Sequence, residues 1–109
     1  MIYFEVEVVK MTVTKSLEKI LIDLTGEPRA EVALHVALKD VVVHRLEIVE
    51  CDIKKMETKY HVTFPEFKRK WEEGQIEKKY SYDVEKDYWE WEGLVSRKNR
   101  IEEISKWLV

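Results

Sequence analysis

The first segment of the chain, residues 2–14, alternates between apolar and polar side chains. A period of two residues is typical of a β-strand, because successive side chains point to opposite faces of a sheet. The phase slips by one residue at Val8 and Val9, which indicates a β-bulge. No second segment matches a strand equally well, and a lone strand cannot satisfy its own backbone. We therefore expect this strand to pair with the same strand of a second copy, or with a partner protein.

A short helical pattern follows the predicted strand. Its apolar residues are spaced i, i+3, i+4 and i+7, which predicts an amphipathic helix, and they are Leu17, Ile20, Leu21 and Leu24. Thr14 or Ser16 can cap the start of this helix, and Gly26 can end it.

A much longer helical pattern runs from Pro28 to about His61 without a helix breaker. Residues 31–38 also alternate, but their alanines favour the helical interpretation. The later part has heptad spacing, given by Leu46, Val49, Ile53, Met56 and Tyr60. Such a helix would be roughly 50 Å long, more than a compact domain of this size accommodates. We expect it either to kink or to project and pair with the last helix as an antiparallel hairpin.

Two further helices are predicted after the long one. The segment 63–66 matches a capping box with Pro in the first turn, so a short helix over 65–73 is expected, ending at Gly74. Ser81 can cap a last helix, whose first turn contains acids that favour a helix N-terminus.

Composition and charge restrict the possible functions. The 109 residues include 19 Lys and Arg and 22 Asp and Glu, so the net charge is −3 and no overall basic field attracts nucleic acid. Two basic clusters, 68–70 and 97–100, lie beside acids and are interpreted as solvated helix faces. The few glycines cannot build a phosphate-binding loop, and no nucleophile motif is present. We expect no enzymatic activity and no cofactor.

The thiol and imidazole groups give little chemistry. The single Cys51 excludes an internal disulfide, and together with a start that lacks a signal-peptide pattern it fits a cytoplasmic protein. The three histidines, His35, His44 and His61, lie seven to ten positions from the thiol or from each other. A structural zinc site needs four ligands at tighter spacing, so we expect no metal site.

The densest chemical feature is the segment 80–93, in which five aromatic residues alternate with five acids. Tyr88, Trp89 and Trp91 cannot all face one side of a helix, since neighbours lie about 100° apart. Some rings should remain exposed for a partner, because Trp and Tyr are favoured interface residues. The alternative is that they close the hairpin core, and both can hold. The candidate partner-binding residues are Tyr82, Glu85, Asp87, Tyr88, Trp89, Glu90 and Trp91.

The order strand, short helix, glycine turn and longer helix over residues 9–45 resembles a ribbon-helix-helix domain. This resemblance implies a dimer whose paired strands place alternate side chains in the DNA major groove. The matching positions are Lys10, Thr12 and Thr14, and Arg29 lies at a helix N-terminus that would hold a phosphate. Glu5 and Glu7, just before these positions, repel phosphate.

A second resemblance covers roughly residues 45–105. Its motifs are Lys59-Tyr60, Phe64-x-x-Phe67, Trp71-x-x-Gly74 and Asp87-Tyr88-Trp89-Glu90-Trp91-Glu92. They are similar to a group of small, mainly archaeal, uncharacterised proteins, some of which are labelled antitoxins. These relatives commonly carry Lys-Tyr-Gly-Met where this chain has Lys59-Tyr60-His61-Val62. The resemblance implies an intracellular protein that holds another protein, such as a toxin nuclease.

The sequence therefore predicts a mainly α fold. An N-terminal strand-helix-helix dimerisation segment over 1–45 would precede a helical hairpin interaction region over 46–109. The leading functional hypothesis is a non-enzymatic, protein-binding module of antitoxin type that forms a homodimer. The alternatives are a ribbon-helix-helix DNA-binding repressor and a purely structural homo-oligomer. No association with a membrane is expected.

Overall fold

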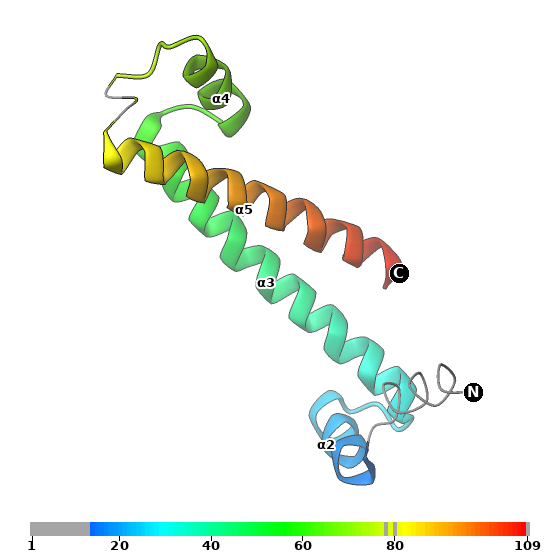
Figure 1. Cartoon of the computed structure of the whole chain (residues 1–109). Coiled ribbons are helices and arrows are strands. Elements are labelled where there is room, and N and C mark those ends of the chain that lie inside the picture. The colour runs from blue at the N-terminus through cyan, green and yellow to red at the C-terminus, as the bar shows by residue number, and fades with distance from the viewer. Residues whose placement is uncertain (1–13, 78, 80, 109) are drawn as a thin grey trace, which may run out of the picture. The chain divides into compact units, whose positions relative to one another are not determined.

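The computed structural model describes residues 14–77, 79 and 81–108, and each regular element within them is an α-helix (Figure 1). The helices are α2 (Lys15–Thr25), α3 (Ala30–Tyr60), α4 (Phe64–Glu72) and α5 (Tyr82–Trp107). The chain divides into two compact units, Met1–Asp40 and Val41–Val109, so the boundary falls within α3. None of the described helices combines the length and the apolar character needed to cross a bilayer.

The predicted combination of an N-terminal β-strand with helices is wrong, because each regular element in the described part of the chain is a helix. Thr14, expected as the last polar position of the strand, is the N-cap of α2, with φ −60° and ψ 154°. An N-cap residue has extended backbone angles, so it continues a period-two pattern without belonging to a strand. Residues 2–13, where the rest of the predicted strand falls, lie outside the described residues. The ribbon-helix-helix assignment and its strand-paired dimer are therefore withdrawn.

Helix α2 has the predicted caps. The Thr14 hydroxyl accepts a hydrogen bond from the Leu17 N–H at 3.2 Å. Gly26 ends the helix with a φ of 76°, and its N–H donates to the Ile22 carbonyl at 2.9 Å. No residue of α2 is buried, and the apolar face predicted from the sequence is exposed at Leu17, Ile20 and Leu24.

Helix α3 is a single helix of 31 residues, as the long pattern predicts, and it includes the ambiguous segment 31–38. Its heptad positions in the second unit face inward: Val49 is buried, and Leu46, Ile53, Met56 and Tyr60 are half-buried. The helix ends at His61, which adopts a left-handed φ of 58°. The His61 N–H donates to the Glu57 carbonyl at 2.7 Å.

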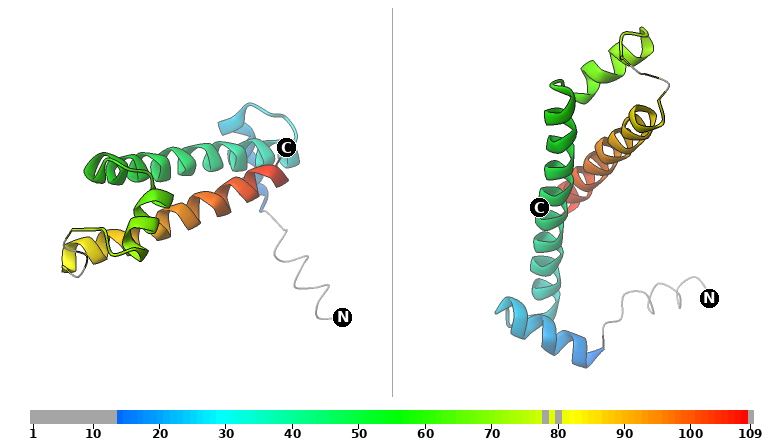
Figure 2. Two further views of the ribbon diagram at one scale, coloured as in Figure 1. Left: turned by 90° about the horizontal axis from the view of Figure 1, so that it is seen from above. Right: turned by 90° about the vertical axis from the view of Figure 1, so that its left-hand side faces the viewer.

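Helices α4 and α5 complete the second unit. The predicted capping box at 63–66 does not form, because Thr63 makes no side-chain hydrogen bond at the start of α4. Glu66 instead lies 3.9 Å from the Lys70 ammonium, one turn later. Gly74 follows α4 with a φ of 69°, as expected for a residue that ends a helix. Helix α5 then runs back along the C-terminal half of α3 in the opposite direction (Figures 1 and 2).

The hydrophobic core of the second unit is an aromatic cluster. Its buried members come from α4 and α5 and are Phe64, Phe67, Tyr88 and Trp91. The Phe67 and Trp91 ring centroids lie 5.1 Å apart, and those of Trp71 and Tyr88 lie 4.5 Å apart. These separations are typical of packed aromatic pairs. Met56 and Tyr60 of α3 pack against the cluster, which therefore joins all three helices.

Candidate functional site

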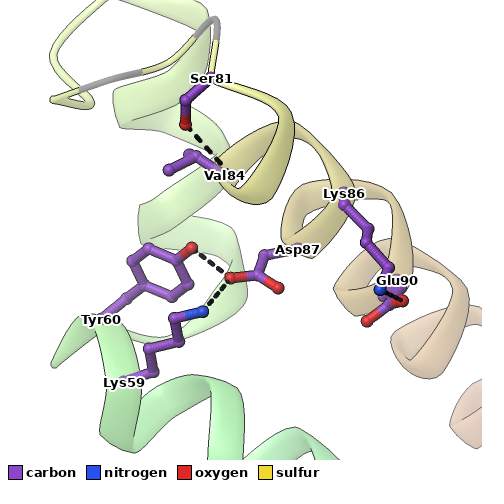
Figure 3. Close-up of polar contacts among 7 residues, drawn as sticks. All are labelled: Lys59, Tyr60, Ser81, Val84, Lys86, Asp87 and Glu90. Carbon is purple, nitrogen blue, oxygen red and sulfur yellow. Dashed lines mark hydrogen bonds and ion pairs between the residues drawn. The ribbon is translucent and has the colours of Figure 1, made fainter.

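Helix α5 separates the predicted partner-binding residues into two groups. The Ser81 hydroxyl accepts the Val84 N–H at 3.4 Å and fixes the start of the helix (Figure 3). Each following residue turns by about 100°, so the alternating sequence is distributed around the helix. Three candidates are buried in the protein's own interior, namely Asp87, Tyr88 and Trp91. The other four are exposed, namely Tyr82, Glu85, Trp89 and Glu90.

Trp91 and Tyr88 belong to the core. Trp91 is 0% exposed and contacts the rings of Tyr60, Phe64 and Phe67. Its Nε1 has no hydrogen-bond partner among the described residues, so the indole contributes through packing alone. These two rings hold α5 in place, and a partner cannot contact them while the core is intact.

Asp87 joins the two arms of the hairpin (Figure 3). Its Oδ2 accepts hydrogen bonds from the Lys59 Nζ at 2.6 Å and from the Tyr60 hydroxyl at 2.5 Å. Local sequence patterns do not predict this contact, because Lys59 and Asp87 are 28 positions apart. One feature of the sequence does point to such a contact. Position 87 is an acid on the inward and otherwise apolar face of α5, and a buried acid needs a hydrogen-bonding or charged partner.

The electrostatics of this contact fix the charge of each group. Burial opposes ionisation of Asp87, but the hydrogen bonds from Lys59 and Tyr60 outweigh it and lower the pKa of the carboxyl. The same hydrogen bond raises the pKa of Lys59. Burial and then the bond to Asp87 raise the pKa of Tyr60. Each group is thus held in its ordinary state at neutral pH, whereas acid–base catalysis needs pKa values near 7.

Tyr82, Glu85, Trp89 and Glu90 form what we call the aromatic-acidic surface. The side chains of Tyr82 and Trp89 are 77% and 60% exposed, and they lie two helical turns apart on the same side of α5. Together with Lys86, the four residues line a shallow hollow of about 360 Å³. The Trp89 ring meets the edge of the buried Tyr88 ring at 85°, with centroids 5.1 Å apart, which restrains it. Lys86 pairs with Glu90 at 3.6 Å (Figure 3).

Two further hollows continue along α5. The first hollow lies between α3 and α5 and has a volume of about 500 Å³. Met56, Gly93 and Leu94 line it, together with the charged side chains of Asp52, Lys55, Glu90 and Arg97. The second, of about 280 Å³, is lined by Arg100, Ile104 and Trp107. Trp107 is 87% exposed. Ile104 and Trp107 are therefore both exposed near the end of α5.

The residues expected to contact DNA are not brought together. Thr14 uses its hydroxyl to cap α2, and Arg29 is an exposed residue just before α3. Lys10 and Thr12 lie outside the described residues. In the described part of the chain, no three side chains of His, Cys, Asp or Glu gather as metal ligands would.

These observations define a protein whose described elements are all helices and whose second unit is a hairpin closed by an aromatic core. The chain belongs to the family described as the uncharacterized protein MJ0235 family, whose family model matches residues 11–108. The predicted similarity to a small uncharacterised family is confirmed at that level. No curated protein and no solved structure matches the chain.

Proposed function

We propose that this protein is a non-enzymatic, protein-binding module of antitoxin type that captures a basic protein partner, such as a toxin, on its aromatic-acidic surface. Tyr82 and Trp89 insert into an apolar depression of the partner. Glu85 and Glu90 flank the rings and face basic side chains around that depression.

The exposed rings carry this proposal. Exposing apolar surface to water costs about 25 cal/mol of free energy for each Å². A partner that covers these side chains removes this cost, and the free energy gained favours binding. Trp and Tyr are also the residues that most often dominate interface energies. Trp89 is suited to this role because its contact with Tyr88 restrains the ring, so little conformational entropy is lost on binding.

Charge selects the kind of partner. The first half of α5, Tyr82–Gly93, contains five acids and one Lys, while Asp87 is already paired with Lys59. The remaining acids create a local negative field although the whole chain is only weakly acidic. Such a field speeds association with a basic surface and disfavours acidic ones.

The buried candidates have a supporting role in this proposal. Asp87, Tyr88 and Trp91 hold α5 against α3 and α4, so the exposed rings are presented from a rigid base. The pKa of Asp87 is lowered and the pKa of Lys59 is raised, so both groups are held in their ordinary charged states, which favours a structural role over catalysis. This supports a binding protein over an enzyme.

Co-expression with the product of the neighbouring gene tests the proposal. The tagged wild-type chain should retain that protein on an affinity column and relieve any growth arrest that it causes. The double substitution Tyr82→Ala and Trp89→Ala should abolish both effects, with helical circular dichroism unchanged. Trp107→Ala is the matched control, because it removes another exposed indole elsewhere on α5. Equal capture by the double variant, or no capture by the wild type, would contradict the proposal.

A further inference from the structure

One side of α5 is exposed along its whole length. We call it the outer face, and its members follow one another every three or four residues: Tyr82, Lys86, Trp89, Gly93, Arg97, Arg100, Ile104 and Trp107. All eight residues are exposed. They lie opposite the inward positions, such as Tyr88, Trp91 and Ile101, that are buried against the rest of the unit. Four of these residues are large and apolar or aromatic, namely Tyr82, Trp89, Ile104 and Trp107, and three are basic. Among the described residues, the outer face is therefore a mixed apolar and basic stripe that is open to solvent.

The charge of α5 reverses along its length. The half Tyr82–Gly93 has five acids and one basic residue, whereas Leu94–Trp107 has four basic residues and two acids. The outer face itself carries Arg97 and Arg100 in its second half, and Glu85 and Glu90 border its first half. A helix with this gradient is complementary to an identical helix that runs in the opposite direction, because each acidic half then faces a basic half.

The positions of the large residues have the same symmetry. If Tyr82 of one helix lies opposite Trp107 of an antiparallel copy, then Trp89 lies opposite Arg100 and Lys86 opposite Glu103. These are an aromatic pair, a cation–π pair and an ion pair. Gly93 falls near the centre of this register, and a Cβ built there meets no atom within 4 Å. Two helices can therefore approach closely at the crossing point.

We propose that the outer face of α5 is the contact by which two copies of this chain associate, with their α5 helices antiparallel about a two-fold axis at the level of Leu94 and Val95. Such a contact is isologous, since the same patch serves both copies. The intrachain pairs Lys86–Glu90 and Arg100–Glu103, at 3.6 and 3.1 Å, are exposed and weak, so they do not oppose re-pairing across the dimer.

This inference goes beyond the proposed function and does not depend on it. Both uses involve Tyr82 and Trp89, so self-association and capture of a partner exclude each other. They differ in the second half of α5, because Arg97, Arg100 and Trp107 contact only the second copy. Substitutions there separate the two proposals.

Charge reversal tests the dimer directly. In one variant Glu85→Lys and Glu90→Lys make the first half of the face basic, and in the other Arg97→Glu and Arg100→Glu make the second half acidic. Each variant alone brings like charges together in both symmetric contacts, so its dimer dissociation constant should rise by at least about tenfold. In an equimolar mixture both contacts become attractive, and a heterodimer of wild-type strength should form. Sedimentation equilibrium of the full-length chains measures each species.

A matched control carries Glu47→Lys and Lys54→Glu, two exposed reversals on α3, and should remain dimeric. Wild type that stays monomeric, single variants that dimerise as well as wild type, or a mixture that stays monomeric would each overturn the inference. The Arg97→Glu and Arg100→Glu variant keeps the aromatic-acidic surface, so it should still capture the neighbouring-gene product. Loss of the dimer with retained capture separates this inference from the proposed function.

Discussion

The Lys59 ammonium lies 2.6 Å from the Asp87 carboxylate, and this contact joins the last turn of α3 to the second turn of α5. The neighbouring Tyr60 donates to the same oxygen. Just beyond this contact, the rings of Tyr60 and Trp91 stack with centroids 5.9 Å apart. A polar contact at the edge of the aromatic core thus fixes the rotation of α5, and with it the side of α5 that faces solvent.

Asp87→Asn should destabilise the protein by about 1–3 kcal/mol, because a hydrogen-bonded charge pair at a largely buried carboxylate is lost. The amide oxygen can still accept from Tyr60, so the helices should remain formed. Glu90→Gln, which removes an exposed pair with Lys86, should change the free energy of unfolding by at most about 0.5 kcal/mol. Urea denaturation of both variants measures the difference, and equal effects would contradict the role assigned to Asp87.

The same contact predicts how stability depends on pH. The pKa of Asp87 is lowered from 3.8 in the folded protein, because the hydrogen bonds from Lys59 and Tyr60 outweigh the effect of burial. Its stabilising contribution is therefore complete above about pH 3.8 and is lost as the pH falls through the lower, folded value. The stability difference between wild type and Asp87→Asn should shrink as the pH is lowered from 5 to 2. A difference that stays constant over this range would be inconsistent with the lowered pKa.

His61→Gly should stabilise the protein by about 0.5–1 kcal/mol. His61 has a φ of 58°, and a side chain in this left-handed region is strained whereas glycine is not. Gly74→Ala is the opposite test and should destabilise the protein by about 1 kcal/mol. Gly74 has a φ of 69°, and a Cβ built there meets no atom within 4 Å, so the expected cost comes from the backbone conformation and not from a steric clash. Thermal unfolding measures both, and changes of the same sign would contradict this explanation.

Two tryptophans that are two positions apart should respond very differently to truncation. Trp91→Ala empties the centre of the aromatic core and should cost about 3–5 kcal/mol. Trp89→Ala removes an exposed ring whose main contact is the edge of Tyr88, so it should cost at most about 1 kcal/mol. Denaturant titration of the two variants compares them. Similar losses would mean that the two faces of α5 are wrongly assigned.

The helices could be predicted from sequence because their signals are local. The period of the apolar residues, the caps at Thr14 and Ser81, and the left-handed glycines 26 and 74 each act within one or two turns. The strand prediction failed at Thr14, where a helix cap has the same extended geometry as a strand residue. The predicted capping box does not form, since Thr63 makes no side-chain hydrogen bond and Glu66 lies 3.9 Å from Lys70, one turn later.

The candidate site could be predicted only in part. Local spacing indicated that the rings at 88, 89 and 91 must point in different directions, but which ring is buried depends on contacts with α3 and α4. Tyr60 and Phe67, which pack around Trp91, are distant from it in sequence. For the same reason the Lys59–Asp87 pair was not found.

The central claim is that Trp89 is a docking residue and Trp91 a core residue. Hydroxyl-radical footprinting with tandem mass spectrometry measures the oxidation of each indole, in the free chain and in the purified complex with the neighbouring-gene product. Trp89 should be oxidised rapidly in the dilute free chain and protected in the complex, while Trp91 should be protected in both. Equal oxidation of Trp89 with and without the bound partner, or rapid oxidation of Trp91 in the folded free chain, would contradict the account.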